Sequence, residues 1–188
     1  MKKGTKKIAI VLMMALLTVV MAACGNNENA SNAGTEGDGL KIAIVTSPSG
    51  VDDGNFNEDN YNGILSFIEN NPTATVKAIR EETGDPAAAV QAVADIVADY
   101  DVIVTPGFQF AGVSTIALEN PDKMFIINDS EPTPVGDQTT FDNIYAMNFA
   151  EQESGFFAGM AAALETKSNK VAVVNGIAYP SNVNYQFG

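Results

Sequence analysis

Short, mostly apolar runs alternate along the chain with segments whose apolar residues recur every three or four positions. The runs are rich in Ile, Val and Phe and are bounded by Gly, Pro, Asn or Asp, which is typical of buried strands. We predict strands at 40–46, 75–79, 101–105, 123–128, 143–148 and 170–174. The segments with helical spacing predict helices at 57–70, 85–99, 110–118 and 150–165.

This alternation predicts the fold class. Strands and helices that alternate through short connections form a parallel sheet flanked by helices on both faces, with right-handed crossovers. We therefore predict an α/β fold from Leu40 onward. In such folds ligands bind at the carboxyl ends of the strands, so the loops that follow the strands are the first places to look for a site.

Those loops carry a distinctive set of side chains. The first strand is followed by Asp52-Asp53-Gly54-Asn55-Phe56-Asn57, the third by Pro106-Gly107-Phe108, and the fourth ends in Asn128-Asp129. A single Phe in a polar loop is more often a packing anchor than a ligand contact. Several aromatic, carboxamide and carboxylate side chains at one sheet edge favour a binding site.

The first 24 residues have the pattern of a bacterial lipoprotein leader. Four lysines precede an apolar stretch from Ile8 to Ala23, and small residues stand directly before Cys24, which is the only cysteine. The stretch is short for a membrane span, which needs ~20 apolar residues. We predict a signal peptide at 1–23 and lipid attachment at Cys24 on the outer face of the cell membrane. An ordinary secreted protein with one free thiol is the alternative.

Composition and charge limit what the rest of the chain can do. Residues 24–39 contain no large apolar side chain and predict a flexible tether. Without the leader the chain keeps six basic and 23 acidic residues, a net charge of −17. Such a surface repels nucleic acid, so we expect no nucleic-acid partner. The absence of a basic cluster also favours an uncharged ligand over a phosphorylated one.

Five motifs, in this order, resemble those of one protein family. They are the Asp52–Asn57 loop, Pro106-Gly107-Phe108, Phe125-Ile126-Ile127-Asn128-Asp129, Asn143-Ile144-Tyr145 and Glu151-Gln152-Glu153-Ser154-Gly155-Phe156-Phe157-Ala158-Gly159. From about Leu40 onward the sequence resembles the basic membrane lipoprotein family, the purine nucleoside-binding lipoproteins of ABC transporters. The resemblance implies the type I periplasmic-binding-protein fold, with two α/β lobes, and a role in nucleoside import with an ABC permease as partner.

The resemblance also implies roles for individual residues. Phe56 matches an aromatic ring that stacks on the base, Asn57 a carboxamide that binds the base edge, and Asp129 an acid beside the ligand. Tyr185 falls where the opposing ring of the second lobe would lie. Asp53 and Phe108, in the same loops, complete the candidate set.

Family members are about twice as long as this chain. The resemblance therefore implies that the chain is a fragment, with most of the first lobe at 40–166 and the start of the second at 167–188. A cleft with one complete side should bind its ligand weakly. We expect a monomer.

Other functions fit the sequence less well. The chain has no histidine and no phosphate-binding or dinucleotide-binding glycine pattern after the first strand, so we expect neither catalysis nor a cofactor. Asp53, Asn55, Asn57 and Asp59 have the spacing of a calcium loop, but Glu58 and Ile64 occupy its glycine and bidentate-acid positions, so we expect no metal. An extracellular sensor and a sugar-binding receptor of the same fold remain alternatives.

Overall fold

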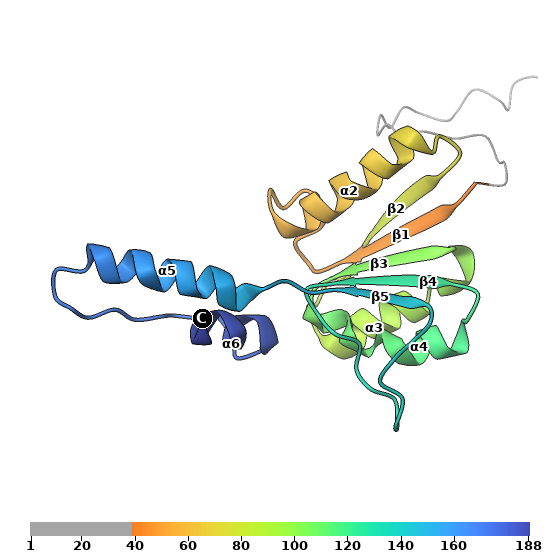
Figure 1. The fold of residues 1–188 in the computed structure, drawn as a ribbon. Helices are drawn as coiled ribbons and strands as arrows, with labels where there is room; N and C mark the ends of the chain where they lie inside the picture. The colour runs from red at the N-terminus through yellow and green to blue at the C-terminus, as the bar shows by residue number, and fades with distance from the viewer. Residues whose placement is uncertain (1–38) are drawn as a thin grey trace, which may run out of the picture. The chain divides into compact units, whose positions relative to one another are not determined.

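A five-stranded parallel sheet forms the centre of the computed structural model, which describes residues 39–188 (Figure 1). Its strands are β1 (Lys41–Thr46), β2 (Thr75–Arg80), β3 (Val102–Pro106), β4 (Met124–Asn128) and β5 (Ile144–Met147). They lie in the order β2-β1-β3-β4-β5, and every neighbouring pair is parallel. The predicted parallel sheet and its first five strands are therefore confirmed.

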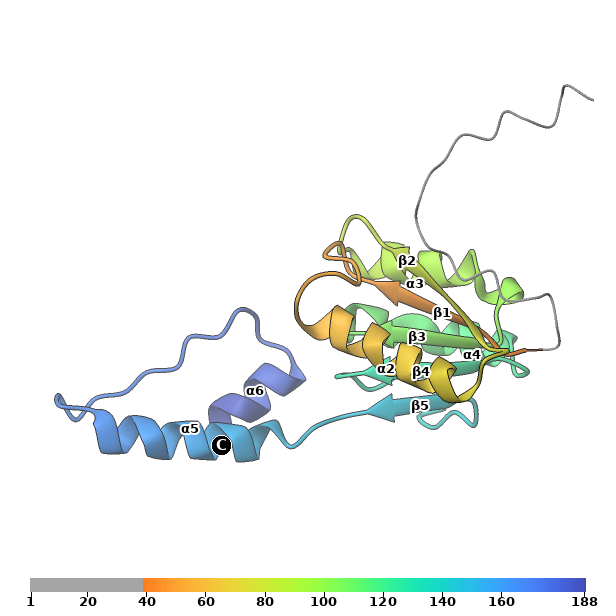
Figure 2. The same cartoon turned by 90° about the horizontal axis from the view of Figure 1, so that it is seen from above.

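Helices cover both faces of the sheet (Figure 1 and Figure 2). The α-helices of the described residues are α2 (Phe56–Asn70), α3 (Pro86–Ala94), α4 (Ser114–Glu119), α5 (Glu151–Glu165) and α6 (Pro180–Phe187), and the 3₁₀ helices are η1 (Val97–Asp99) and η2 (Phe108–Val113). Helix α2 lies on one face, and α3 and α4 lie on the other. This is the arrangement that the alternation of strands and helices predicts.

Alternate side chains of the strands form two hydrophobic cores. Val45, Ile103 and Phe125 are fully buried on the face covered by α3, η2 and α4. Ile44 and Val104 point to the other face, where they pack with residues of α2. Strands buried on both faces read as continuous apolar runs, which is why the sequence identifies them so clearly.

Two of the predicted helices have different limits in the structure. The helix predicted at 85–99 begins as expected, because the Asp85 carboxylate accepts hydrogen bonds from the N–H groups of Ala87 and Ala88 at 2.9 and 3.1 Å. It ends at Ala94, where the Ile96 N–H bonds to the Val93 carbonyl and the chain tightens toward η1. The helix predicted at 110–118 is η2 followed by α4.

The strand predicted at 170–174 is wrong. These residues form neither helix nor strand, and Val171, Val173 and Val174 are 61%, 54% and 95% exposed. A strand needs a neighbouring strand for its backbone hydrogen bonds, and within residues 39–188 no strand pairs with this segment. The apolar, β-branched sequence is therefore not sufficient to form a strand here.

Helices α5 and α6 pack against each other and have few contacts with the strands. Their backbones approach closely at Gly155, where a Cβ atom would collide with the carbonyl oxygen of Tyr185. Large apolar side chains of α5, among them Phe157 and Leu164, are 66% and 83% exposed. The predicted lobe boundary at residue 166 would divide this helix pair, and it stays a prediction.

Within residues 39–188, no helix has both the length and the apolar character needed to cross a bilayer. The predicted signal peptide, the lipidation residue Cys24 and the tether up to residue 38 lie outside the described residues.

Candidate ligand-binding site

The carboxyl ends of β1, β3 and β4 border a cleft of about 390 Å³. Five of the six candidate ligand contacts line it: Asp53, Phe56, Asn57, Phe108 and Asp129. The strands bring them together because the carboxyl ends of parallel strands meet at one edge of the sheet. The cleft therefore lies where the sequence predicts a site.

Asp53 organises the start of α2. Its carboxylate accepts hydrogen bonds from the N–H groups of Asn55, Asn57 and Glu58, at 3.0, 3.2 and 3.1 Å. Partial burial raises the pKa of this carboxyl, but the three N–H donors together outweigh that effect and hold the pKa below its ordinary value of 3.8. Asp53 is thus an anion that satisfies the free N–H groups of a helix N-terminus.

Phe56 and Asn57 follow directly on that helix. The Phe56 side chain is 36% exposed in the cleft, whereas Asn57 is 2% exposed. The Asn57 amide nitrogen donates a hydrogen bond to the Ser47 hydroxyl at 3.0 Å, which links α2 to the end of β1. This bond fixes the orientation of the Asn57 carboxamide, and the exposed ring beside it can contact a flat ligand.

Phe108 reaches the cleft through an unusual backbone turn. Gly107 has a φ of 105°, and a Cβ atom there would lie 2.6 Å from the Oε1 atom of Gln109. The Gly107 N–H donates to the Asn128 carbonyl at 2.9 Å, so the loop is fixed to the end of β4. Only glycine fits this turn, and the turn leaves the Phe108 ring 39% exposed at the sheet edge.

Asp129 directly follows β4 and has a left-handed conformation with a φ of 61°. Its N–H bonds to the Met147 carbonyl at 2.8 Å, and its Oδ2 atom accepts hydrogen bonds from the hydroxyls of Tyr179 and Ser181, at 3.0 and 3.4 Å. Positive φ is uncommon for residues other than glycine, and such strain is concentrated at functional sites. The backbone thus directs this carboxylate toward Tyr179 and the cleft.

Tyr179 is a cleft residue that the sequence analysis missed. Its ring lies on Phe108 with a centroid separation of 4.5 Å and an angle of 34° between the ring planes. Burial raises the pKa of its phenol; the Ser181 hydroxyl opposes this change, and the charges of Asp129 and Glu151 add to it. Tyr179 stands 50 residues from Asp129 in the chain, so no local pattern pairs them.

Tyr185 is the one candidate that the structure does not bring to this cleft. It belongs to α6 and lines a different cavity, of about 500 Å³, with Phe149, Glu151 and Phe157. Its role as an opposing ring stays a prediction.

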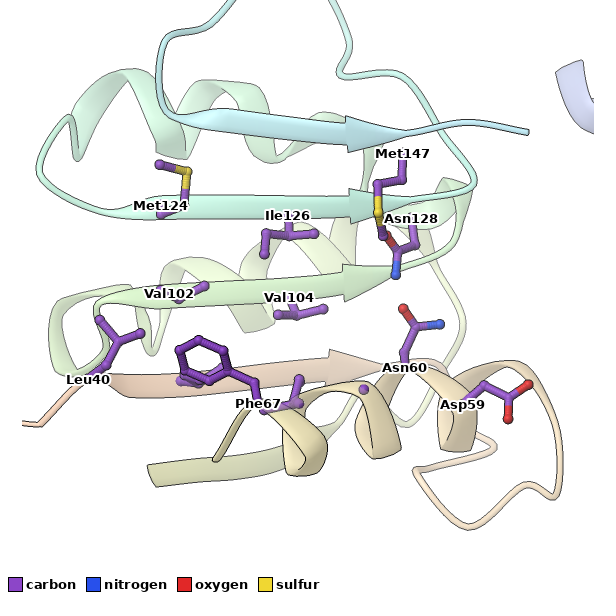
Figure 3. Close-up of a pocket in the computed structure, with 13 residues that line it drawn as sticks. Leu40, Asp59, Asn60, Phe67, Val102, Val104, Met124, Ile126, Asn128 and Met147 are labelled. Atoms are coloured by element: carbon purple, nitrogen blue, oxygen red, sulfur yellow. The ribbon is translucent and has the colours of Figure 1, made fainter. Parts of the chain in front are cut away.

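A further cavity of about 490 Å³ lies between α2 and strands β3 and β4 (Figure 3). Its walls are mostly apolar and include Phe67 of α2, Val102 of β3 and Met124 of β4. Polar side chains gather at one end, where Asn60 lies near Asn128. None of the six candidate ligand contacts lines this groove, so it is separate from the cleft.

Comparison with known proteins assigns the family. Residues 40–188 match the family described as "ABC transporter substrate-binding protein PnrA-like". The chain belongs to this family. The resemblance seen in the motifs is therefore confirmed.

Curated relatives of this substrate-binding family extend beyond the chain. The ABC transporter nucleoside-binding protein BmpA of Lactococcus lactis is 29% identical over 182 residues, which are 92% of this chain and 48% of the relative. Basic membrane protein A of Borreliella burgdorferi is 27% identical over 175 residues, 89% of this chain and 46% of the relative. The chain thus spans about half the length of the curated relatives that it matches.

Solved structures agree on the fold. An ABC transporter solute-binding protein from Aeropyrum pernix matches with a TM-score of 0.55 at 21% identity, over 66% of this chain and 32% of that one. A transcriptional activator of the comK gene from Bacillus halodurans matches with a TM-score of 0.54 at 23% identity, over 78% and 47%. These similarities and the parallel sheet confirm the predicted type I periplasmic-binding-protein fold.

Proposed function

We propose that this chain belongs to the substrate-binding component of an ABC importer and that it binds a nucleoside, with a purine base, in the cleft at the carboxyl ends of β1, β3 and β4. The observation that carries the proposal is the presence of two partly exposed aromatic rings, Phe56 and Phe108, with a carboxylate in one cleft. The Lactococcus lactis relative, which is named as nucleoside-binding, supports the same ligand class.

The chemistry of the cleft suits a nucleobase joined to a sugar. A base has a flat π-face, and stacking on an aromatic side chain contributes about 1–3 kcal/mol per base. Asn57 offers a carboxamide to the donors and acceptors on the base edge. Asp129 offers carboxylate oxygens to ribose hydroxyls. Phe56 is therefore the proposed stacking ring, and the two polar side chains orient the ligand.

Charge favours a nucleoside over a nucleotide. Among the described residues that line the cleft none is Lys or Arg, whereas Asp53 and Asp129 are acidic. A phosphate group there would lack a cationic partner and would be repelled by the carboxylates. The proposed role is binding and delivery of an uncharged ligand, without catalysis.

A titration with several ligands tests the proposal. The chain is observed by NMR while guanosine, inosine, ribose, glucose or guanosine monophosphate is added up to millimolar concentration. We expect the two nucleosides to shift resonances of cleft residues with weak affinity, and the other compounds to have little effect. A response to the free sugars alone would contradict the proposal and favour a sugar-binding receptor.

The matched variants are Phe56→Ala and Phe67→Ala. Both rings belong to α2 and are similarly exposed, at 36% and 44%, but only Phe56 lines the cleft. We expect the nucleoside Kd to rise roughly 5- to 150-fold in Phe56→Ala and to stay unchanged in Phe67→Ala. Equal affinities in the two variants would indicate that Phe56 is a packing residue and does not contact the ligand.

We further propose that Cys24 carries a lipid and holds the protein on the outer face of the cell membrane, beside its permease. The leader pattern before Cys24 supports this proposal. In cells grown with labelled palmitate, we expect the label in the wild-type protein and none in Cys24→Ser. Label that persists in the variant would refute lipidation at this residue.

A further inference from the structure

Tyr179 makes two contacts with the cleft, and both involve groups that the proposed ligand would use. Its ring covers part of Phe108 at 4.5 Å, and its hydroxyl donates to the Oδ2 atom of Asp129 at 3.0 Å. The ring is thus a flat aromatic group with a hydroxyl directed at a carboxylate. A nucleoside would offer the same pair of features, a π-face and sugar hydroxyls.

Tyr179 also stands between two cavities. Together with Phe108 and Asp129 it lines both the cleft of about 390 Å³ and a neighbouring cavity of about 520 Å³. The second cavity has polar side chains from Glu131, Asn148 and Asn184 on its walls. Displacement of the Tyr179 ring would therefore enlarge the space available beside Phe108.

The attachment of Tyr179 to the sheet edge is made by its side chain. The hydrogen bonds of its backbone join it to Ile177 and Val183, within its own segment. The preceding residues, 167–178, form no helix or strand. The phenol can consequently leave Phe108 and Asp129 without breaking a backbone hydrogen bond of the sheet.

We propose that Tyr179 is an internal competitor for the binding site, which occupies the Phe108 ring face and an Asp129 oxygen until a ligand displaces it. The inference rests on the proposed function, because it concerns control of access to the same site. It assigns Tyr179 a role in setting the affinity of the cleft.

The affinity of a hydroxyl-free variant tests the competition. Tyr179→Phe keeps the ring but removes the hydroxyl that donates to Asp129, while the longer Ser181 contact at 3.4 Å stays in place. Because a hydrogen bond to a charged group is lost only from the ligand-free state, we expect guanosine and inosine to bind about tenfold more tightly. Tyr145→Phe is the matched control, since Tyr145 is 61% exposed on β5 and lines none of these cavities. Unchanged or weaker binding by Tyr179→Phe would overturn the inference.

A second readout needs no ligand and separates this inference from the proposed function. With 3-fluorotyrosine in place of the five tyrosines, the ¹⁹F signal missing from Tyr179→Phe identifies residue 179. The pKa read from that signal should lie above the value of free 3-fluorotyrosine, and Asp129→Asn should lower it more than Glu151→Gln does. Phe108→Ala should change its chemical shift through loss of the ring contact.

The nucleoside affinities and the ¹⁹F signal of Tyr179 together distinguish failure of this inference from failure of the proposed function. If no variant binds a nucleoside, the proposed function fails, and the ¹⁹F signal alone judges whether Tyr179 occupies the site. A signal that responds neither to Asp129→Asn nor to Phe108→Ala would show that Tyr179 does not occupy the Phe108 ring face and the Asp129 oxygen. If nucleosides bind and the ¹⁹F signal of Tyr179 shows no change on saturation, the competition is wrong while the proposed function stands.

Discussion

At the scale of single residues, the cleft contains two carboxylates that differ in their hydrogen-bond partners. Asp53 is surrounded by backbone N–H donors, so its charge stabilises the start of α2. Asp129 is bound by side-chain hydroxyls, which a ligand can replace. The same residue type is structural in one loop and available for binding in the other, because the partner groups differ. The sequence places both acids after strands but does not distinguish their partners.

Substitution of Asp53 should therefore lower stability. We expect Asp53→Ala to reduce the free energy of unfolding by about 1 kcal/mol, the usual effect of losing a helix N-terminal cap. Urea denaturation of Asp53→Ala and of its neighbour Asp52→Ala measures the difference, since Asp52 lies exposed in the same loop. Equal loss in both variants would show that the N–H contacts of Asp53 contribute nothing.

The Asp53 contribution should also depend on pH. Because the folded-state pKa lies below the ordinary value of 3.8, the contribution is complete above that value and disappears as the pH falls through the folded-state pKa. Asp53→Asn should consequently differ from wild type more at neutral pH than at an acidic pH below 3.8. A deficit of constant size at both pH values would exclude the charge as its cause.

The candidate residues show how far sequence reasoning reaches. Phe56 and Asp129 could be placed at one edge of the sheet because the carboxyl ends of parallel strands converge. Tyr179 could not, because its position depends on how the segment after α5 returns to Asp129. Proximity to Pro180 marks Tyr179 as a residue that precedes a helix, but nothing local indicates its contact with Phe108.

At the scale of elements, the sequence predicts strands whose two faces are both buried. It does not predict whether a given strand finds a neighbouring strand to pair with. The strands at 41–46 and 102–106 read as apolar runs because their neighbours cover both sides. The run at 170–174 has the same composition but no partner strand among the described residues. Composition therefore reports the propensity for a strand, whereas pairing decides whether it forms.

Helices α5 and α6 approach closely at Gly155. A side chain at Gly155 would collide with the Tyr185 carbonyl, whereas nothing lies within 4 Å of a Cβ at Gly159 on the same helix. We expect Gly155→Ala to separate α6 from α5, and Gly159→Ala to stabilise α5 by about 0.5–1 kcal/mol. Hydrogen exchange of the α6 amides measures the first effect, and exchange of the α5 amides measures the second. Protection that survives in Gly155→Ala would contradict the close packing.

At the scale of the whole molecule, fold and family were predictable because motifs from five loops and helices occur in a fixed order. The match over residues 40–188 and the parallel sheet agree with that reading. The limits of the lobes are harder to predict, because α5 follows the sheet in sequence but packs with α6. We propose that α5 and α6 belong to one lobe, so that the boundary falls between β5 and α5.

The account depends most directly on where a nucleoside lies. Intermolecular nuclear Overhauser effects between guanosine, labelled in its base, and the aromatic rings of the chain locate the base. We predict contacts from the base protons to Phe56 and, because the bound ligand displaces the Tyr179 ring, also to Phe108. Contacts confined to the rings of α5 and α6, or to Phe67 in the apolar groove, would contradict binding in the cleft.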